Sequence, residues 1–263
     1  MRADQFLTAF GHVQSRKRAQ TLIEEGNVTI DGVVVKKSSQ QIADGEHEVR
    51  VVDTMRYVGR GGYKLEGALK AFALDVKDAV ALDIGASTGG FTDCLLQHGA
   101  KLVYAVDAGD GQLVSSLRKN PAVVSLEHLN ARELTPMHIG NKLVDLIVMD
   151  VSFISATYII PQFPELLTED GYAVCLIKPQ FEVGKAMLGK GGIVKDASAH
   201  RFAIDRVCDC VRAVGLNPID LISSPITGGD GNREFLLLIQ RNQVDTATLT
   251  DARIRAVLNG AGS

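Results

Sequence analysis

The sequence predicts a doubly wound α/β domain with a seven-stranded, mostly parallel sheet, preceded by a small α+β domain. From residue 79 onward, apolar runs rich in Val, Ile and Leu alternate with amphipathic helical segments. Near-continuous apolar strands joined by helices are typical of a parallel sheet that is covered on both faces. Residues 1–60 differ, because they contain two short helical patterns and a hairpin signal. We expect the small domain at 1–58, a linker and helix at 59–78, the large domain at 79–241 and a tail at 242–263.

Composition places the chain among globular proteins that bury a sizeable core. Of its 263 residues, 46% are hydrophobic and 22% are charged, which is usual for such proteins. No apolar stretch approaches the roughly 20 residues of a membrane helix, and the N-terminal residues lack the apolar segment of a secretory signal. The four cysteines lack the paired spacing of a metal site. We therefore expect a cytoplasmic protein with reduced thiols and no metal.

Two helices and a hairpin are predicted, in that order, in the small domain. Apolar spacing predicts helices at about 4–10 and 15–25, and Gly26 ends the second helix, since glycine readily adopts the left-handed conformation found after helices. Asp31-Gly32 lies between two β-branched runs. This dipeptide favours a tight hairpin because both turn positions need a positive φ.

The formal net charge of −3 does not by itself indicate a nucleic-acid-binding protein, so that case depends on local clusters. Arg16, Lys17 and Arg18 open the second predicted helix, and Lys36 and Lys37 follow the hairpin. Each cluster alone is typical of a solvated surface, but together they would present one basic face to phosphates. The order of elements, around SRKRAQTLIEEGNVTIDG, resembles the alpha-L RNA-binding domain named after ribosomal protein S-four. This resemblance implies contact with structured RNA, and we expect neither DNA nor a membrane as a partner.

A lysine precedes the large domain at an unusual position. Apolar residues at helical spacing, from Leu65 to Phe72, predict a helix that begins near residue 63, after a loop at 60–62. Lys64 then lies in the first turn, where a cation opposes the helix dipole. Since this position has a cost and no evident structural benefit, Lys64 is a candidate for a functional role.

Strands and helices alternate through the large domain. An antiparallel last strand at the end of the sheet would place its first residue beside the last residues of the other strands. The predicted strands span 79–84, 102–107, 122–126, 143–150, 172–178, 217–223 and 234–240, and the predicted helices span 91–98, 155–167 and 199–214.

A glycine-rich turn, DIGASTGGF at 83–91, follows the first of these strands. In doubly wound sheets, ligands bind at this carboxyl edge. The turn fits neither a P-loop, since Phe91 follows Gly90, nor the dinucleotide fingerprint G-x-G-x-x-G. Its spacing resembles motif I of S-adenosylmethionine-dependent methyltransferases, while a lone glycine turn is also typical of tight strand-to-helix packing. The candidate cofactor-binding residues are Asp83, Gly85, Ala86, Ser87, Gly89, Gly90 and Phe91, with Asp107 at the end of the second strand for the ribose hydroxyls.

Four charged residues stand at or near the ends of predicted elements: Lys64, Asp150, Lys178 and Glu234. Each one alone is typical of an exposed charge that caps a strand. Together, two lysines and two acids suit the methylation of a hydroxyl group, which needs a base. A lysine serves as that base only when its pKa falls from about 10.4 toward neutrality. Partial burial and a second cation nearby both act in that direction.

These four residues match, in order and context, the K-D-K-E tetrad of 2′-O-ribose RNA methyltransferases of the FtsJ type. The words GRGGYKLEGAL, DIGASTGGFTDCLL, VMDVSFIS, IKPQFEVGK and GNREFLLLIQ resemble the TlyA family, also called hemolysin A. The resemblance implies a Rossmann-like domain that uses S-adenosyl-L-methionine to methylate cytidine 2′-hydroxyls in ribosomal RNA. It also implies Lys178 as the base, Asp150 and Lys64 as its electrostatic setting, and Glu234 as the orienting acid.

The same resemblance implies further cofactor contacts from Asn130, near the adenine, and from Asp150. Two positions depart from the family pattern. Gly59 stands where a serine is expected, and His128-Leu129 replaces a more polar pair ahead of Asn130.

A glycine-rich segment at 179–196 also contains three lysines. This composition is typical of a mobile surface loop, and beside the catalytic edge it would bring Lys185 and Lys190 to phosphates. Arg60, in the loop before Lys64, completes the expected RNA-binding set.

Two other functions stay open from the sequence alone. The older family name points to a membrane-lysing hemolysin, but no membrane helix, long amphipathic helix or barrel pattern is evident. The other is a ribosome-assembly factor that binds RNA without catalysis, although a binding module has no use for paired lysines at a cofactor's methyl group. We assign no role to the tail.

Overall fold

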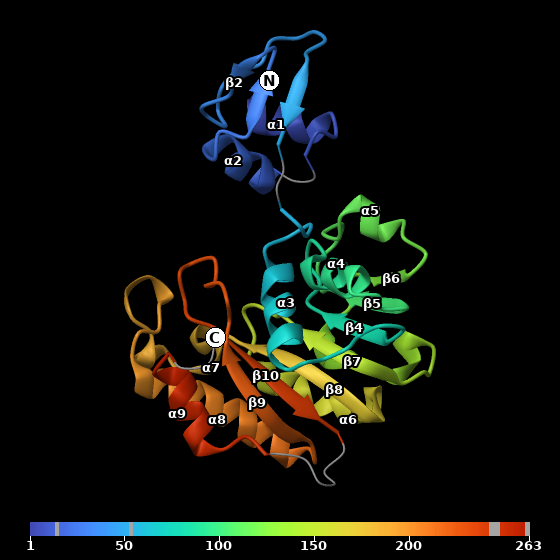
Figure 1. The fold of residues 1–263 in the computed structure, drawn as a ribbon, viewed down its shortest axis with the longest axis vertical. Helices are drawn as coiled ribbons and strands as arrows, with labels where there is room; N and C mark the ends of the chain where they lie inside the picture. The colour runs from blue at the N-terminus through green and yellow to red at the C-terminus, as the bar shows by residue number, and fades with distance from the viewer. Residues whose placement is uncertain (14–15, 53–54, 242–247, 261–263) are drawn as a thin grey trace. The chain divides into compact units, whose positions relative to one another are not determined.

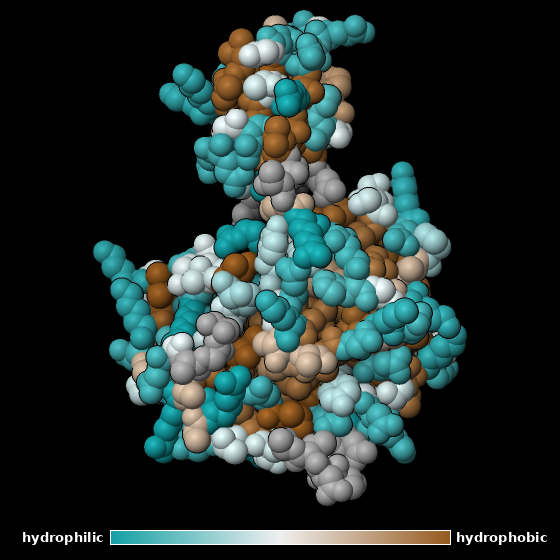
Figure 2. Space-filling view, in the orientation of Figure 1, coloured by the Kyte–Doolittle hydropathy of each residue, from teal (hydrophilic) through white to brown (hydrophobic). Residues whose placement is uncertain are grey.

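The computed structural model describes residues 1–13, 16–52, 55–241 and 248–260. These residues form two compact units, Met1–Arg56 and Tyr57–Ser263 (Figure 1). Each unit has its own hydrophobic core. Figure 2 shows hydrophilic side chains over much of the face in view, with hydrophobic ones between them. In the described part of the chain, no helix is long and apolar enough to cross a membrane.

The small unit combines two helices with a three-stranded antiparallel sheet in the order β2-β1-β3. The hairpin turns at Asp31 and Gly32, whose φ angles of 52° and 76° are positive, as the sequence predicts. The third strand was not predicted, because three residues are too few for a recognisable two-residue period. The elements are α1 (Ala3–Ala9), α2 (Arg16–Glu24), β1 (Val28–Ile30), β2 (Val33–Val34) and β3 (Val49–Val51).

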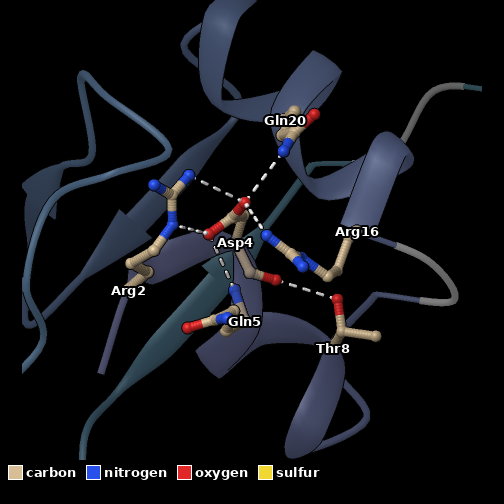
Figure 3. A network of polar contacts seen from close by, with 6 residues as sticks. All are labelled: Arg2, Asp4, Gln5, Thr8, Arg16 and Gln20. Atoms are coloured by element: carbon tan, nitrogen blue, oxygen red, sulfur yellow. Dashed lines mark hydrogen bonds and ion pairs between the residues drawn. The ribbon is translucent and has the colours of Figure 1, made fainter.

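A buried carboxylate, Asp4, joins the two helices of the small unit (Figure 3). It accepts hydrogen bonds from Arg2 at 3.0 and 3.1 Å, from Arg16 at 3.2 Å and from Gln20 at 2.8 Å. The bonds from Arg2 lower the pKa of Asp4 most, against the effect of burial, and those from Gln20 and Arg16 lower it further. Arg16, expected on the RNA-binding face, therefore also holds α2 against α1.

The large unit contains a seven-stranded sheet, as predicted, in the order β6-β5-β4-β7-β8-β10-β9. Strands β6 to β8 are parallel neighbours, while β10 is antiparallel to both β8 and β9. The last strand therefore lies inside the sheet and not at its end, which corrects the expectation from sequence. All of β10 is buried, so its backbone groups need a partner strand on each side. The strands are β4 (Val80–Ile84), β5 (Leu102–Val106), β6 (Val123–Leu126), β7 (Val144–Met149), β8 (Leu167–Ile177), β9 (Asn217–Ser223) and β10 (Phe235–Gln240).

Helices cover both faces of this sheet, which confirms the doubly wound prediction. Along β10, Leu236 and Leu238 join the core beneath α3 and α4, whereas Leu237 and Ile239 join the core beneath α8 and α9. This alternation follows from the two-residue period of a strand. The helices are α3 (Gly61–Ala71), α4 (Gly90–Gln97), α5 (Ser115–Arg118), α7 (Pro179–Glu182), α8 (Ala197–Ala213) and α9 (Asp251–Leu258).

The prediction of a long helix at 155–167 is wrong. This segment instead forms two 3-10 turns and the short helix α6 (Phe163–Leu166). Pro161 and Pro164 lack the backbone N–H that a continuous helix needs, and each stands near the start of a new short segment. Strand β8 then begins at Leu167 and not at residue 172.

Replacing Asp4 with asparagine is expected to destabilise the small unit at pH 7 by about 2 kcal/mol, because charge-assisted bonds from two arginines are lost. An acid whose pKa falls on folding stabilises the folded state above its unfolded pKa, here 3.8, and loses this contribution as the pH falls below it. Hydrogen exchange of the α1 and α2 amides in the full chain measures the effect. Asp44→Asn, at an exposed carboxylate of the same unit, is the control. Equal protection in the two variants would contradict the role of Asp4.

Candidate active site

Four charged side chains form a continuous series of ion pairs at the carboxyl edge of the large sheet. Lys64 Nζ lies 2.6 Å from Glu234 Oε2 and 3.7 Å from Asp150 Oδ2. Lys178 Nζ lies 2.5 Å from Asp150 Oδ1 and donates a hydrogen bond to Ser152 Oγ at 2.8 Å. Asp150 therefore joins the two lysines, and two anions balance two cations.

The sheet topology explains why these residues meet. β7 and β8 are parallel neighbours, so Asp150 and Lys178, which follow them, leave the sheet at the same edge. β10 runs in the opposite direction, and its first residue pairs with the last residue of β8, so Glu234 enters at this edge. Lys64 comes from the first turn of α3, which packs on the same sheet.

All four residues are largely withdrawn from solvent. Lys64 and Lys178 are each 8% exposed and Glu234 is 2% exposed, while the Asp150 side chain is 19% exposed. Charged groups are rarely buried to this extent unless they are paired. Because a buried ion pair adds little stability compared with apolar packing, the cluster is better explained by a chemical role than by a structural one.

A cavity of about 560 Å³ opens beside these ion pairs. Its volume is in the range of small-molecule sites. The cavity combines polar groups with apolar side chains such as Leu129 and Ile154. The residues predicted for cofactor binding that line it are Gly85, Ser87, Asp107, Asn130 and Asp150.

The glycine-rich turn and Asp107 shape this cavity. Gly85 has a φ of 86°, and a Cβ there would lie 2.6 Å from the carbonyl oxygen of Asp150, so only glycine fits between the turn and the end of β7. The two carboxylate oxygens of Asp107 accept hydrogen bonds from the backbone N–H groups of Ser87 and Gly109, both at 2.8 Å. These bonds fix the carboxylate, and each oxygen keeps a second lone pair for a ligand hydroxyl.

A second cavity, of about 200 Å³, shares lining residues with the first. Lys178 lines the second cavity, and Asp150 and Ser152 line both. Asp150 and Lys178 therefore lie where the two cavities meet. The other predicted residues that line the second cavity are Arg60, Gly85, Ala86, Ser87, Gly90 and Phe91.

Two residues predicted for cofactor binding lie outside both cavities. Gly89 has a φ of 100°, and a Cβ there would lie 2.3 Å from Leu117, so this glycine allows the turn to pack. Asp83 is fully buried, and its Oδ2 accepts a hydrogen bond from Thr92 at 2.7 Å. Burial is the main cause that raises the pKa of Asp83, to about 7.

The residues expected to bind RNA have different surroundings. Arg60 lines the second cavity, whereas Arg16 contributes to the Asp4 network. Arg18 is half-buried. Lys17 lies in α2, and its side chain is outside the described set. Arg16 and Arg60 are exposed, as are Lys36, Lys37, Lys185 and Lys190.

The sequence analysis does not single out Phe153, which the structure places at this site. Phe153 lines the large cavity and is 91% exposed. Its φ of 64° lies in the left-handed region, which is rare for a bulky residue. An apolar residue just after a buried strand is ordinarily predicted to lie in the core. No periodicity in the sequence indicates that the backbone at Phe153 turns its side chain into solvent.

Comparison with known proteins places both units in families. The model of the FtsJ-like methyltransferase family matches residues 57–241, and the S4 domain model matches residues 1–47. A Mycobacterium tuberculosis relative, named 16S/23S rRNA (cytidine-2′-O)-methyltransferase TlyA, is 43% identical over 98% of each chain. Hemolysin A of Brachyspira hyodysenteriae is 42% identical over 90% of this chain and 98% of its own.

Solved structures agree with these matches. A proposed hemolysin from Streptococcus thermophilus is 39% identical, with a TM-score of 0.78 over 99% of this chain and 94% of that one. A structure from Listeria monocytogenes, at 15% identity and a TM-score of 0.52, shares the fold alone. The family matches, together with the fold, thus define an FtsJ-like methyltransferase that carries an N-terminal S4 domain. Within this class, the chain belongs to the TlyA family, also called hemolysin A.

The buried Asp83 predicts a pH-dependent stability. Because its pKa rises from 3.8 to about 7 on folding, the carboxyl stabilises the folded state fully below the unfolded pKa, and this contribution is lost as the pH rises through the folded pKa. The free energy of unfolding should therefore fall between about pH 4 and pH 7, by up to about 1.4 kcal/mol per pH unit. Asp83→Asn should show a smaller fall, because an amide does not titrate, while asparagine can still accept the bond from Thr92. Chemical denaturation at several pH values measures both slopes, and equal slopes would contradict this account.

Proposed function

We propose that this protein transfers the methyl group of S-adenosyl-L-methionine to a cytidine ribose 2′-hydroxyl in ribosomal RNA. The observation that carries the proposal is the series of ion pairs Glu234, Lys64, Asp150 and Lys178, which ends where the two cavities meet. Relatives from Mycobacterium tuberculosis and Campylobacter jejuni are named for this reaction, which supports the same substrate here. A ribosomal substrate in turn favours a cytoplasmic location.

The large cavity fits S-adenosyl-L-methionine. The carboxylate of Asp107 is suited to ribose hydroxyls. Asn130 Oδ1 accepts a bond from the Arg132 backbone N–H at 3.1 Å, which leaves its NH₂ group to donate to an adenine nitrogen. When bound, the cofactor supplies an electrophilic methyl group on a sulfonium centre.

Lys178 is the general base in this proposal. As the neutral amine, Lys178 Nζ accepts the proton of the 2′-hydroxyl, so that the oxygen can attack a methyl carbon. Asp150 and Ser152 hold Nζ on two sides and thereby direct it. Lys64 contacts the second oxygen of Asp150, and Glu234 fixes Lys64. Each member of the tetrad therefore orients the next, and only Lys178 moves a proton.

Substrate RNA is proposed to present one unstacked nucleotide. A ribose within folded RNA reaches a recessed base only after its nucleotide leaves the stack. The exposed ring of Phe153, at the edge of the large cavity, offers a stacking surface for the displaced cytosine. Arg60 in the second cavity offers a cation to a neighbouring phosphate. The S4 domain, with its exposed Lys36 and Lys37, supplies a separate grip on RNA.

Lys178→Met tests the proposed reaction. Methionine keeps the aliphatic stem but removes the amine, so methyl transfer to unmodified ribosomal subunits should fall by at least about a hundredfold. Cofactor affinity, measured by calorimetry, should change by less than about threefold, because the lysine lines the second cavity and not the first.

Lys77→Met is the matched control, since Lys77 is an exposed lysine in the segment before β4, remote from the carboxyl edge. Its rate should equal that of the wild type. Substantial transfer by Lys178→Met would show that another group accepts the proton.

Phe153→Ala should lower kcat/KM for RNA by about tenfold, the value of one base-stacking contact, without a comparable loss of cofactor affinity. Phe153→Tyr should restore the rate. Phe202, an exposed phenylalanine on α8, gives the control Phe202→Ala. If both alanine variants methylate RNA like the wild type, Phe153 does not contact the substrate base.

A further inference from the structure

We propose that Glu182 is a positioning residue for this reaction, because it fixes the Ser152 loop (residues 151–155) against the segment that carries Lys178. The proposal rests on the proposed function and adds a residue outside the tetrad. Glu182 is the last residue of α7, a four-residue helix that begins directly after Lys178. It is 1% exposed and lines neither of the two cavities. Its effect on the reaction is therefore indirect.

The carboxylate of Glu182 holds the far end of the Ser152 loop with both oxygens. Oε2 accepts a hydrogen bond from Ser155 Oγ at 2.5 Å, and Oε1 accepts one from the backbone N–H of Ala156 at 2.8 Å. One bond fixes a side chain and the other fixes the backbone. The end of the loop thus has little freedom to turn or shift.

Other contacts between the same two segments hold the rest of the loop. Lys178 Nζ contacts Asp150 and Ser152 at the near end. The ring of Phe153 packs on that of Phe181, with 5.4 Å between the centroids. Residues 178–182 therefore hold the loop at its start, its middle and its end, and Glu182 provides the contact at the end.

Glu182 is itself anchored from behind. Arg206, on the long helix α8, donates a hydrogen bond from Nη1 to the carbonyl oxygen of Glu182 at 2.6 Å. A helix as short as α7 has too few internal bonds to hold its own position. The contact with Arg206 therefore transmits the rigidity of α8 to the Ser152 loop.

The Ser152 loop contains a strained residue, which explains why the loop needs the contacts from Glu182. Phe153 has a φ of 64°, a conformation that persists in a bulky residue only where the surroundings impose it. A buried carboxylate is costly, and burial raises the pKa of Glu182, so an apolar residue would serve stability at least as well. Glu182 makes two directed hydrogen bonds to the end of this strained loop, and an apolar residue could not make them.

Kinetics of three variants test the proposal. Glu182→Ala should lower kcat at saturating RNA and cofactor by about tenfold to a hundredfold, while the dissociation constant of S-adenosyl-L-methionine changes by less than about threefold. Glu182→Gln should keep kcat close to that of the wild type, since the amide can accept the bond from Ala156 and donate one to Ser155. Ser155→Ala removes one of the two bonds and should lower kcat less than Glu182→Ala does. If Glu182→Ala does not fold, Ser155→Ala still tests the contact between Glu182 and the loop.

Asp145→Ala is the matched control. Asp145 also bonds a backbone N–H, that of Val80 at 2.9 Å, but it lies near the start of β7, at the opposite end of the strand from Asp150. Its kcat should match the wild type. Equal kcat values for Glu182→Ala and Asp145→Ala would overturn the proposal, as would a Glu182→Gln variant as slow as Glu182→Ala.

Fluorescence separates this proposal from the proposed function. The chain contains no tryptophan, so Phe153→Trp introduces a single reporter into the Ser152 loop. Its anisotropy should fall when Glu182→Ala is added and should stay unchanged with Glu182→Gln or Asp145→Ala. An unchanged anisotropy in the Glu182→Ala background would overturn the positioning role even in an active methyltransferase. A fall in anisotropy without methylation by the wild type would count against the proposed reaction alone.

Discussion

The carboxylate of Asp150 is shared by two lysines, and the arrangement of the large unit depends on this one group. Lys178 approaches one oxygen at 2.5 Å and Lys64 approaches the other at 3.7 Å. Neither lysine would be stable at this depth without an anion, and the second lysine takes its other partner from Glu234. The interaction requires two parallel strands to end, and one antiparallel strand and one covering helix to begin, at the same edge of the sheet. The position of β10 beside β8 meets this requirement.

The same residue links chemistry to cofactor binding. Asp150 lines both cavities, and its carbonyl oxygen lies against Gly85, where no side chain fits. Any shift at the end of β7 would therefore disturb the glycine-rich turn and the lysine pair together. Beyond Asp150, the chain enters the Ser152 loop, whose far end is fixed by Glu182. We infer that cofactor, base and substrate surface are aligned through this one stretch of backbone.

The sequence predicts the sheet and three members of the ion-paired cluster, all except Lys64, for a simple reason. Buried strands appear as apolar runs, and a charge at the end of such a run is visible without a structure. Phe153 and Glu182 are not predictable in this way, because one depends on a single backbone angle and the other on a partner in a distant segment. The prediction of a helix at 155–167 is wrong because the apolar residues of this segment fit a helical pattern, whereas its two prolines interrupt the backbone hydrogen bonds of a helix. Asp83 belongs to the glycine-rich motif and is therefore predicted to bind the cofactor, yet its side chain is buried beside Thr92. Only the packing seen in the structure shows this.

The central claim is that the cluster around Asp150 directs a methyl group to a ribose oxygen of ribosomal RNA. The most direct measurement is the chemical identity of the product formed from unmodified ribosomal subunits and methyl-labelled S-adenosyl-L-methionine. Alkali cleaves RNA only where the 2′-hydroxyl is free, so 2′-O-methylation leaves a dinucleotide uncut. We predict that the label appears in an alkali-resistant dinucleotide that begins with cytidine. Label released in a mononucleotide methylated on its base would contradict the account.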